Sequence, residues 1–177
     1  RSDHPVSLYA ATKKSNELMA DCYAHLYQLP STGMRFFTVY GPYGRPDMAY
    51  YSFADNYFAR KPIRVYNGGD VHHDLFRDFT YVDDVVECVI RLLHLPPAGT
   101  RPHEIYNIGG SRPESLTDFI TTLEEALGST LGRPVVFDKV YEAIKPGDVA
   151  ATHANTARLS DRISYTPQVP LTDGLRL

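Results

Sequence analysis

Segments with helical periodicity alternate with short segments rich in β-branched and aromatic residues, and this alternation limits the fold more than any other feature of the sequence. In the first helical segment, residues 7–29, Leu18, Cys22 and Leu26 recur every four positions and predict an apolar stripe. Further helices are predicted over residues 49–60, 82–94, 116–127 and 156–161, and strands over residues 33–40, 62–66, 104–108 and 134–137. Because helices and strands alternate, we expect an α/β fold.

Residues at the ends of two helices support these assignments. Ser7 can cap the first helix, and Pro30 ends it. Ser115, followed three residues later by Asp118, is a weak variant of the capping box. The stretches 67–76 and 141–151 are polar and are predicted to be connections.

Charge and composition exclude several classes of protein. The 177 residues carry 18 basic and 21 acidic side chains, a net charge of −3, which gives no electrostatic argument for a nucleic-acid partner. No apolar run approaches the roughly 20 residues that span a bilayer, and residues 1–5 lack a signal pattern. Cys22 and Cys88 lie among apolar residues, so we expect two buried free thiols in a cytoplasmic protein without a membrane partner.

Tyr9 and Lys13 form the sharpest local motif. Positions i and i+4 share one face of a helix, and an ammonium close to a phenol stabilises the phenolate. Such a tyrosine can exchange a proton with a sugar hydroxyl. The spacing alone is common, and a solvated helix face is the alternative.

The surrounding residues resemble a known family. Residues 9–17, YAATKKSNE, resemble the YxxxK helix of extended short-chain dehydrogenases/reductases. Further blocks that match this family follow in its order, at residues 35–42, 77–84, 106–109 and 146–149. Residues 41–49, GPYGRPDMA, are similar to the corresponding segment of UDP-glucuronate 4-epimerases in particular.

The resemblance implies the C-terminal part of a Rossmann-like parallel sheet and a smaller sugar-nucleotide-binding α/β lobe. Residues 1–45 and about 78–110 would belong mainly to the nucleotide domain, and about 46–77 and 111–177 to the substrate lobe. The strands over 33–40 and 104–108 should be parallel neighbours in the nucleotide domain, with the other two strands in the lobe. No G-x-x-G-x-x-G or G-x-G-x-x-G follows a strand. Both ends look cut, and we expect the glycine-rich N-terminal half to be missing.

Four residues match family positions around the cofactor NAD. The resemblance makes Tyr9 the catalytic acid/base, and Lys13 the residue that binds the nicotinamide ribose and tunes Tyr9. Phe36 and Val39 would flank the nicotinamide. For these two a core strand is an equally good explanation.

Three residues match positions at the sugar nucleotide. Thr38 stands where UDP-glucuronate enzymes have a threonine near the substrate. Arg45 and Arg77 resemble arginines that meet the nucleotide, and a guanidinium can bind diphosphate or carboxylate oxygens with two hydrogen bonds. For a lone arginine, solvated surface is the alternative.

The rest of the implied substrate site is less specific. Asp148 resembles the carboxylate that binds ribose hydroxyls, with an acidic cap on a turn as the alternative. Lys145 could contact a phosphate, and Tyr66 could lie against the uracil. The sequence departs from the family pattern by an insertion that includes His72-His73-Asp74. Metal binding there is disfavoured, because adjacent side chains in an extended segment point to opposite sides. We expect no metal and a flexible loop on the substrate side.

Two functions follow as hypotheses. The first is a portion of an NAD-dependent UDP-glucuronate 4-epimerase, which forms UDP-galacturonate through a 4-keto intermediate and is inactive as this piece. Another UDP-sugar epimerase, a dehydratase or a decarboxylase of the superfamily is the nearest alternative. The second is a non-catalytic module that binds sugar nucleotides or dimerises. The resemblance also implies a homodimer of the parent protein through the first helix.

Overall fold

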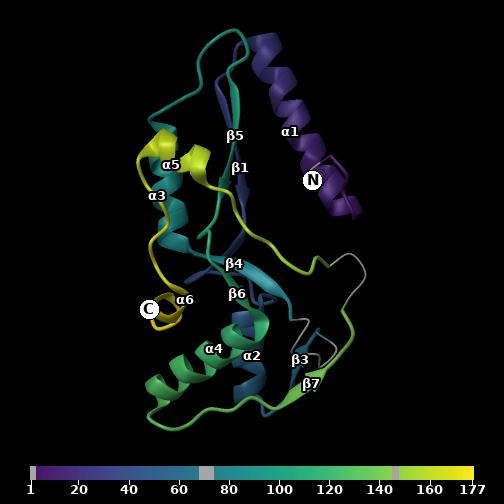
Figure 1. Cartoon of the computed structure of the whole chain (residues 1–177), viewed down its shortest axis with the longest axis vertical. Helices are drawn as coiled ribbons and strands as arrows, with labels where there is room; N and C mark the ends of the chain where they lie inside the picture. Colours follow the sequence, from purple (N-terminus) through teal and green to yellow (C-terminus); the bar gives the residue numbers. More distant parts are fainter. Residues whose placement is uncertain (1–2, 68–73, 145–147) are drawn as a thin grey trace.

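The computed structural model describes residues 3–67, 74–144 and 148–177, which form an α/β fold with parallel strands (Figure 1). The helices are α1 (Leu8–Tyr27), α2 (Ala49–Phe58), α3 (Val82–Leu93), α4 (Leu116–Leu131), α5 (Ala157–Ile163) and α6 (Leu171–Gly174). The strands are β1 (Ser31–Phe36), β2 (Thr38–Tyr40), β3 (Ile63–Val65), β4 (Phe76–Tyr81), β5 (His103–Ile108), β6 (Pro113–Ser115) and β7 (Lys139–Tyr141).

Parallel pairing of β1 with β5 confirms the predicted neighbours, with Gly33 opposite Ile105. The predicted strand over 33–40 is interrupted at Phe37, whose N–H still donates to the carbonyl of Ile108 (3.1 Å). Beyond the interruption β2 pairs in parallel with β4, which also pairs antiparallel with β6. β3 and β7 form a separate parallel pair. The segment of residues 31–40 therefore pairs with β5 through β1 and with β4 through β2.

The strand predicted over 134–137 is wrong. Val135 and Phe137 are buried and Val136 is exposed, so the alternation is real. The N–H of Phe137, however, donates to Oε1 of Glu124 (2.7 Å) instead of to a neighbouring strand. The strand in this region is β7, two residues further on. β4 and β6 have no counterpart among the predicted strands, and the first residue of β4, Phe76, falls in the predicted connection over 67–76.

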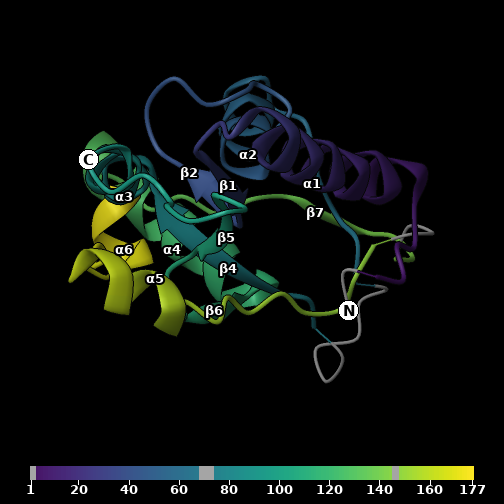
Figure 2. The same ribbon diagram turned by 90° about the horizontal axis from the view of Figure 1, so that it is seen from above.

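α1 covers one face of the β1–β5 pair, and α3 and α5 lie on the other (Figures 1 and 2). Oγ of Ser7 accepts a hydrogen bond from the N–H of Ala10 (3.1 Å), which confirms the predicted cap. The helix ends at Tyr27, and Gln28 follows in a left-handed conformation (φ 52°).

The apolar stripe of α1 faces outward. Six of its side chains are exposed: Leu18, Met19, Cys22, Tyr23, Leu26 and Tyr27. The expectation of a buried Cys22 is therefore wrong, because the helix turns its polar face to the strands. Cys88 is buried in α3 as expected, and burial raises the pKa of its thiol to about 11.

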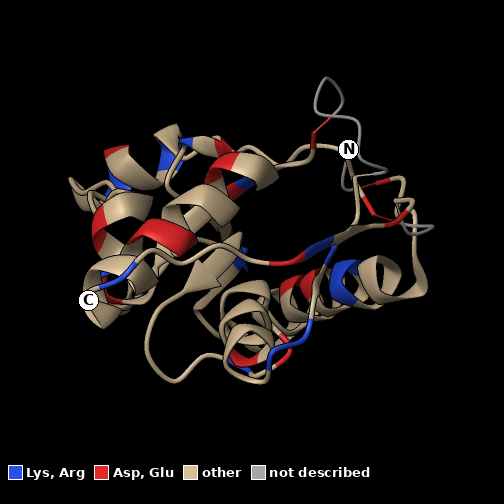
Figure 3. Cartoon of the chain, turned by 90° about the horizontal axis from the view of Figure 1, so that it is seen from below, with Lys and Arg blue, Asp and Glu red and all other residues tan. Residues whose placement is uncertain are grey.

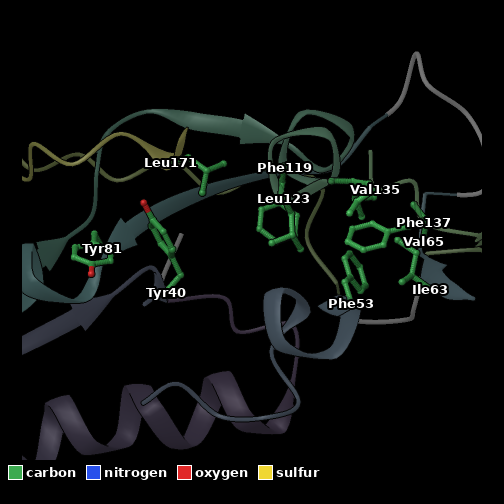
Figure 4. Close-up of a cluster of buried hydrophobic side chains, with 11 residues drawn as sticks. Tyr40, Phe53, Ile63, Val65, Tyr81, Phe119, Leu123, Val135, Phe137 and Leu171 are labelled. Atoms are coloured by element: carbon green, nitrogen blue, oxygen red, sulfur yellow. The ribbon is translucent and has the colours of Figure 1, made fainter. Parts of the chain in front are cut away.

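Two clusters of buried side chains hold helices α2–α6 to the strands. The first joins β2, β3, β4, α2, α4 and α6, and its members include Tyr40, Phe53, Ile63, Val65, Tyr81, Phe119, Leu123, Val135, Phe137 and Leu171 (Figure 4). The second joins α3, β5 and α5, through Val85, Cys88, Leu92, Tyr106, Ile108, Leu159 and Ile163. Phe53 and Phe119 of the first cluster also line the cavity described below.

Charged residues of both signs are interspersed along the chain (Figure 3). Among the described residues, no helix is long and apolar enough to cross a membrane.

Candidate functional site

A cavity of about 780 Å³ opens between α2, β3, β4 and the N-terminus of α4. Four residues predicted at the substrate from separate motifs line it: Thr38, Tyr66, Arg77 and Asp148. Thr38 starts β2, Tyr66 follows β3, Arg77 lies on β4, and Asp148 belongs to the segment after β7. The fold thus brings together residues that are up to 110 positions apart in the sequence.

Alternation along β4 directs Arg77 to this cavity. Asp78 is fully buried on one side of the strand, whereas Arg77 and Phe79 line the cavity on the other. Nη1 of Arg77 donates to the carbonyl of Phe76 (2.9 Å), so the guanidinium keeps further donors for a ligand. A second hollow of about 540 Å³ shares Thr38 and Arg77 with the first.

Five polar lining residues were missed in the sequence, and the first of them, Asp47, precedes α2. Ser52 and Asn56 project from α2, Lys61 follows that helix, and Arg64 lies on β3. The spacing of Ser52 and Asn56 places them on one helix face. The burial of both neighbours of Arg64 in β3 directs it outward, where Nη1 lies 3.5 Å from Oε1 of Glu142. Both patterns are visible in the sequence. Among the described residues, three basic side chains line the cavity, namely Lys61, Arg64 and Arg77.

Arg45 does not line either cavity, although its neighbours Asp47 and Met48 line the larger one. It is exposed, and its Nε lies 3.3 Å from Oδ1 of Asp47. Gly44 packs tightly beside it, because a Cβ there would approach the hydroxyl of Tyr50 to 2.1 Å. The loop thus places Arg45 at the rim.

Tyr9 and Lys13 lie together on α1, as their spacing predicts. Nζ of Lys13 is 5.3 Å from the centroid of the Tyr9 ring. Tyr9 is 70% exposed, and the described residues that line the two cavities include neither Tyr9 nor Lys13. The ammonium of Lys13 therefore lies over the phenol of Tyr9, and this phenol is open to a ligand.

Phe36 and Val39 have different surroundings. Phe36 is half exposed and lines the smaller hollow beside Thr38. Val39 packs against the second core cluster, which matches the alternative of a core strand.

Several predicted residues lie outside the described part of the chain, namely Lys145, His72 and His73. Asp74, next to the two histidines, accepts hydrogen bonds from the N–H groups of Leu75 and Thr117 (both 2.8 Å). Burial acts to raise the pKa of Asp74, but these bonds and one from Asn67 outweigh it and lower the pKa. Within residues 3–67, 74–144 and 148–177, no group of three or more metal-ligating side chains is present.

Comparison with known proteins identifies relatives along nearly the whole chain. The model of the NAD dependent epimerase/dehydratase family matches residues 1–109. A probable UDP-glucuronate 4-epimerase of Rhizobium meliloti is 41% identical over 99% of this chain and 53% of its own length. UDP-glucuronate 4-epimerase 1 of Arabidopsis thaliana is also 41% identical, over 99% of this chain and 42% of its own.

A solved structure has the same arrangement of elements. The UDP-glucuronic acid 4-epimerase of Bacillus cereus, in complex with UDP-glucuronic acid and NAD, matches with a TM-score of 0.83 and 32% identity. The match covers 97% of this chain and 51% of that protein. The chain thus spans about half the length of the curated relatives it matches.

Proposed function

The chain belongs to the NAD dependent epimerase/dehydratase family, and we propose that it is the C-terminal portion of an NAD-dependent UDP-glucuronate 4-epimerase. The observation that carries this proposal is the cavity of about 780 Å³ on which Thr38, Tyr66, Arg77 and Asp148 converge. Its volume lies within the range of about 300–1,000 Å³ that is usual for sites of small ligands. The named relatives at about 41% identity are UDP-glucuronate 4-epimerases, which supports the choice of sugar.

In this proposal the cavity binds the nucleotide. The guanidinium of Arg77 binds the diphosphate through charge-assisted hydrogen bonds. Asp148 accepts hydrogen bonds from the ribose hydroxyls, and Tyr66 lies against the uracil. Lys145, outside the described residues, adds a phosphate contact. Lys61 and Arg64 line the same cavity and add positive charge for an anionic ligand.

The sugar lies at the Thr38 side of the cavity, where the two hollows meet. The hydroxyl of Thr38 can donate to the glucuronate, and Arg45 at the rim can supply a guanidinium to an anionic group. Both assignments rest on the resemblance to UDP-glucuronate enzymes and on the place of each residue beside the cavity.

Residues present here fit the nicotinamide end of NAD. The smaller hollow offers Phe36, half exposed, next to Thr38, and α1 offers the exposed ring of Tyr9 with the ammonium of Lys13 close to it. In the proposal Lys13 holds the ribose, and Phe36 and Val39 flank the nicotinamide. The chemistry that NAD supplies when bound is reversible hydride transfer at C4 of the sugar.

Tyr9 then acts on the sugar as acid and base. It takes the proton of the C4 hydroxyl as the 4-keto sugar forms, and returns a proton when the other epimer forms. Between the two steps Tyr9 holds this proton as a phenol, and the positive charge of Lys13 stabilises the phenolate that is present before the first step and after the second.

The proposal includes the arrangement of the parent protein. Residues 1–45 and about 78–110 belong mainly to the nucleotide domain, and about 46–77 and 111–177 to the substrate lobe. The exposed stripe of α1 forms a homodimer interface in the parent, since apolar patches of this kind drive association.

Calorimetry with the 177-residue chain tests the nucleotide site. We expect UDP-glucuronate to bind, and UMP, without the diphosphate, to bind more weakly. The isolated chain should form no UDP-galacturonate with added NAD, because its sequence supplies no glycine-rich turn for the pyrophosphate.

Activity of the longer protein tests the reaction. Conversion of UDP-glucuronate to UDP-galacturonate supports the proposal, whereas a dehydrated or decarboxylated product would assign the chain to another enzyme of the superfamily. Turnover by the isolated chain would contradict the assignment of roles.

A further inference from the structure

Asp78 on β4 is fully buried, and its carboxylate joins three segments of the chain. One oxygen accepts a hydrogen bond from the N–H of Gly110 (2.7 Å), which follows β5. The other accepts from the N–H of Ala154 (2.8 Å), in the segment before α5. The N–H of Asp78 itself donates to Oγ1 of Thr152 (3.2 Å). The side chain therefore uses both oxygens to hold two separate backbone segments against β4.

Both neighbours of Asp78 in the strand, Arg77 and Phe79, line the cavity. Successive side chains of a strand point to opposite faces, so fixing the buried carboxylate also fixes the direction of Arg77. The pairing of Phe79 with Thr38 passes this constraint to β2, the strand that carries a further lining residue.

The segment held through Ala154 leads back to Asp148. Phe76 donates to the carbonyl of Ala150 (2.9 Å), and Thr152 donates to the carbonyl of Phe76 (3.1 Å). This short ladder and the bond from Ala154 to Asp78 anchor the segment to β4. The wall that carries Arg77 and the wall that carries Asp148 thus meet at one carboxylate.

The approach of these segments depends on two glycines. A Cβ on Gly109 would lie 2.3 Å from Cβ of Ala154, and one on Gly110 would lie 2.7 Å from the carbonyl oxygen of Phe79. Any side chain at either position would push the turn away from Asp78. The turn is therefore built to bring its N–H group to this carboxylate.

We propose that Asp78 is a positioning residue of the nucleotide site, which holds Arg77 and the Asp148 segment at the distance that the ligand requires. The inference rests on the proposed function of the cavity. An aspartate suits the task because two N–H donors converge on it, and an asparagine offers only one acceptor oxygen.

Asp78→Asn tests the proposal, with Asp84→Asn as the matched control. Asp84 is a buried carboxylate on α3 that also accepts two backbone hydrogen bonds, from Gln168 (3.0 Å) and Val169 (2.9 Å), and one from the hydroxyl of Tyr165. Asp78→Asn places an amide donor against one of two N–H groups and should lower stability. In Asp84→Asn one oxygen can still accept from both N–H groups while the amide nitrogen faces the hydroxyl of Tyr165, so stability should fall less. Only the first disturbs the cavity.

Calorimetry with UDP-glucuronate measures the difference in the 177-residue chain. We expect Asp78→Asn to raise the Kd about tenfold, and Asp84→Asn to change it less than about twofold. In an Arg77→Ala background, Asp78→Asn should cost less than it does alone, because the two residues act on the same contact. An unchanged Kd in Asp78→Asn, or an equal rise in both variants, would overturn the proposal.

Two arms keep the test decisive. If Asp78→Asn does not fold, Thr152→Val removes the acceptor of the Asp78 N–H, and it should still raise the Kd; an unchanged Kd then counts against the proposal. If the unaltered chain does not bind UDP-glucuronate, the proposed function fails, and amide NMR spectra judge the positioning role. Asp78→Asn should then shift the resonances of Arg77 and Asp148, and unshifted resonances would overturn it.

Discussion

The carboxylate of Glu17 on α1 binds the guanidinium of Arg35 on β1 through two hydrogen bonds, of 2.5 Å to Nε and 2.7 Å to Nη2. One helical turn further on, Asp21 binds Arg101 in the same way, at 2.8 and 2.6 Å. Both carboxylates therefore lie on the side of α1 that faces the β1–β5 pair. The helix is held to the strands by paired charges, and this leaves its apolar stripe exposed.

Glu17→Gln should weaken this attachment most at neutral pH. The hydrogen bond from Arg35 lowers the pKa of Glu17 from its usual 4.5, although burial acts to raise it. A lowered pKa in the folded state stabilises the fold above pH 4.5, and this contribution is lost as the pH falls through the lowered pKa. Urea unfolding should show a loss of roughly 0.5–1 kcal/mol at pH 7 that is smaller at pH 3.

The exposed Glu125 on α4 provides the control for that measurement. Glu125→Gln should leave the free energy of unfolding nearly unchanged at both pH values. A loss for Glu17→Gln that is the same at pH 3 and pH 7 would show that the ion pair is not its cause.

The exposed stripe of α1 should make the chain associate. Leu18 and Leu26 are each more than half exposed, about two turns apart on one face, and burying them against a second surface is favourable. Sedimentation velocity at high concentration should show self-association, which Leu26→Glu reduces. Leu93→Glu, at an equally exposed leucine on α3, should leave it unchanged. A single monomeric species at every concentration would count against this interface.

Tyr9→Phe should abolish most activity of the longer protein. The substitution keeps the ring beside Lys13 and removes the only ionisable group on it. We expect turnover of UDP-glucuronate to fall by about 10²-fold or more, with little change in binding. Tyr27→Phe, at another exposed tyrosine of α1, is the control and should retain full activity. An undiminished rate in Tyr9→Phe would remove this residue from the mechanism.

Arg77→Ala should act mainly on binding. Arg77 lines both cavities, and in the proposed function its guanidinium binds the diphosphate. Loss of a charge-assisted hydrogen bond should weaken the binding of UDP-glucuronate by roughly 1.5–3 kcal/mol in calorimetry. Arg162, whose guanidinium donates to the carbonyl of Leu95, provides the control. Arg162→Ala should bind UDP-glucuronate normally. Equal affinity of the Arg77 and Arg162 variants would exclude the role of Arg77.

Local patterns in the sequence were sufficient for helices α1 to α5, but not for the short α6. The N-cap at Ser7 and the apolar periodicity predicted α1, α2, α3 and α5 to within a few residues. α4 runs four residues past its predicted end at residue 127, to Leu131. It ends where Gly132 adopts a left-handed conformation with a φ of 64°. These features depend on neighbours within one or two turns, which the sequence displays directly.

Strands depended on partners that the sequence does not display. β4 is a strand because β2 and β6 supply its hydrogen bonds, and Arg77 and Asp78 gave it too polar a pattern to be recognised. Residues 134–137 have the right alternation but no strand beside them, since the N–H of Phe137 bonds to a side chain. A strand is defined by pairing, which only the tertiary structure decides.

The candidate site divides in the same way. The sequence by itself determined which residue types stand in the motifs. Four of these motif residues, Thr38, Tyr66, Arg77 and Asp148, line one cavity. Only the tertiary structure decided that Asp78 is buried between two cavity walls and that the stripe of α1 faces outward. The burial of Asp78 and the direction of the stripe depend on which segments meet across the sheet. The backbone N–H groups that bind Asp78 and the arginines that bind α1 are distant in the sequence, so no periodic pattern predicts these contacts.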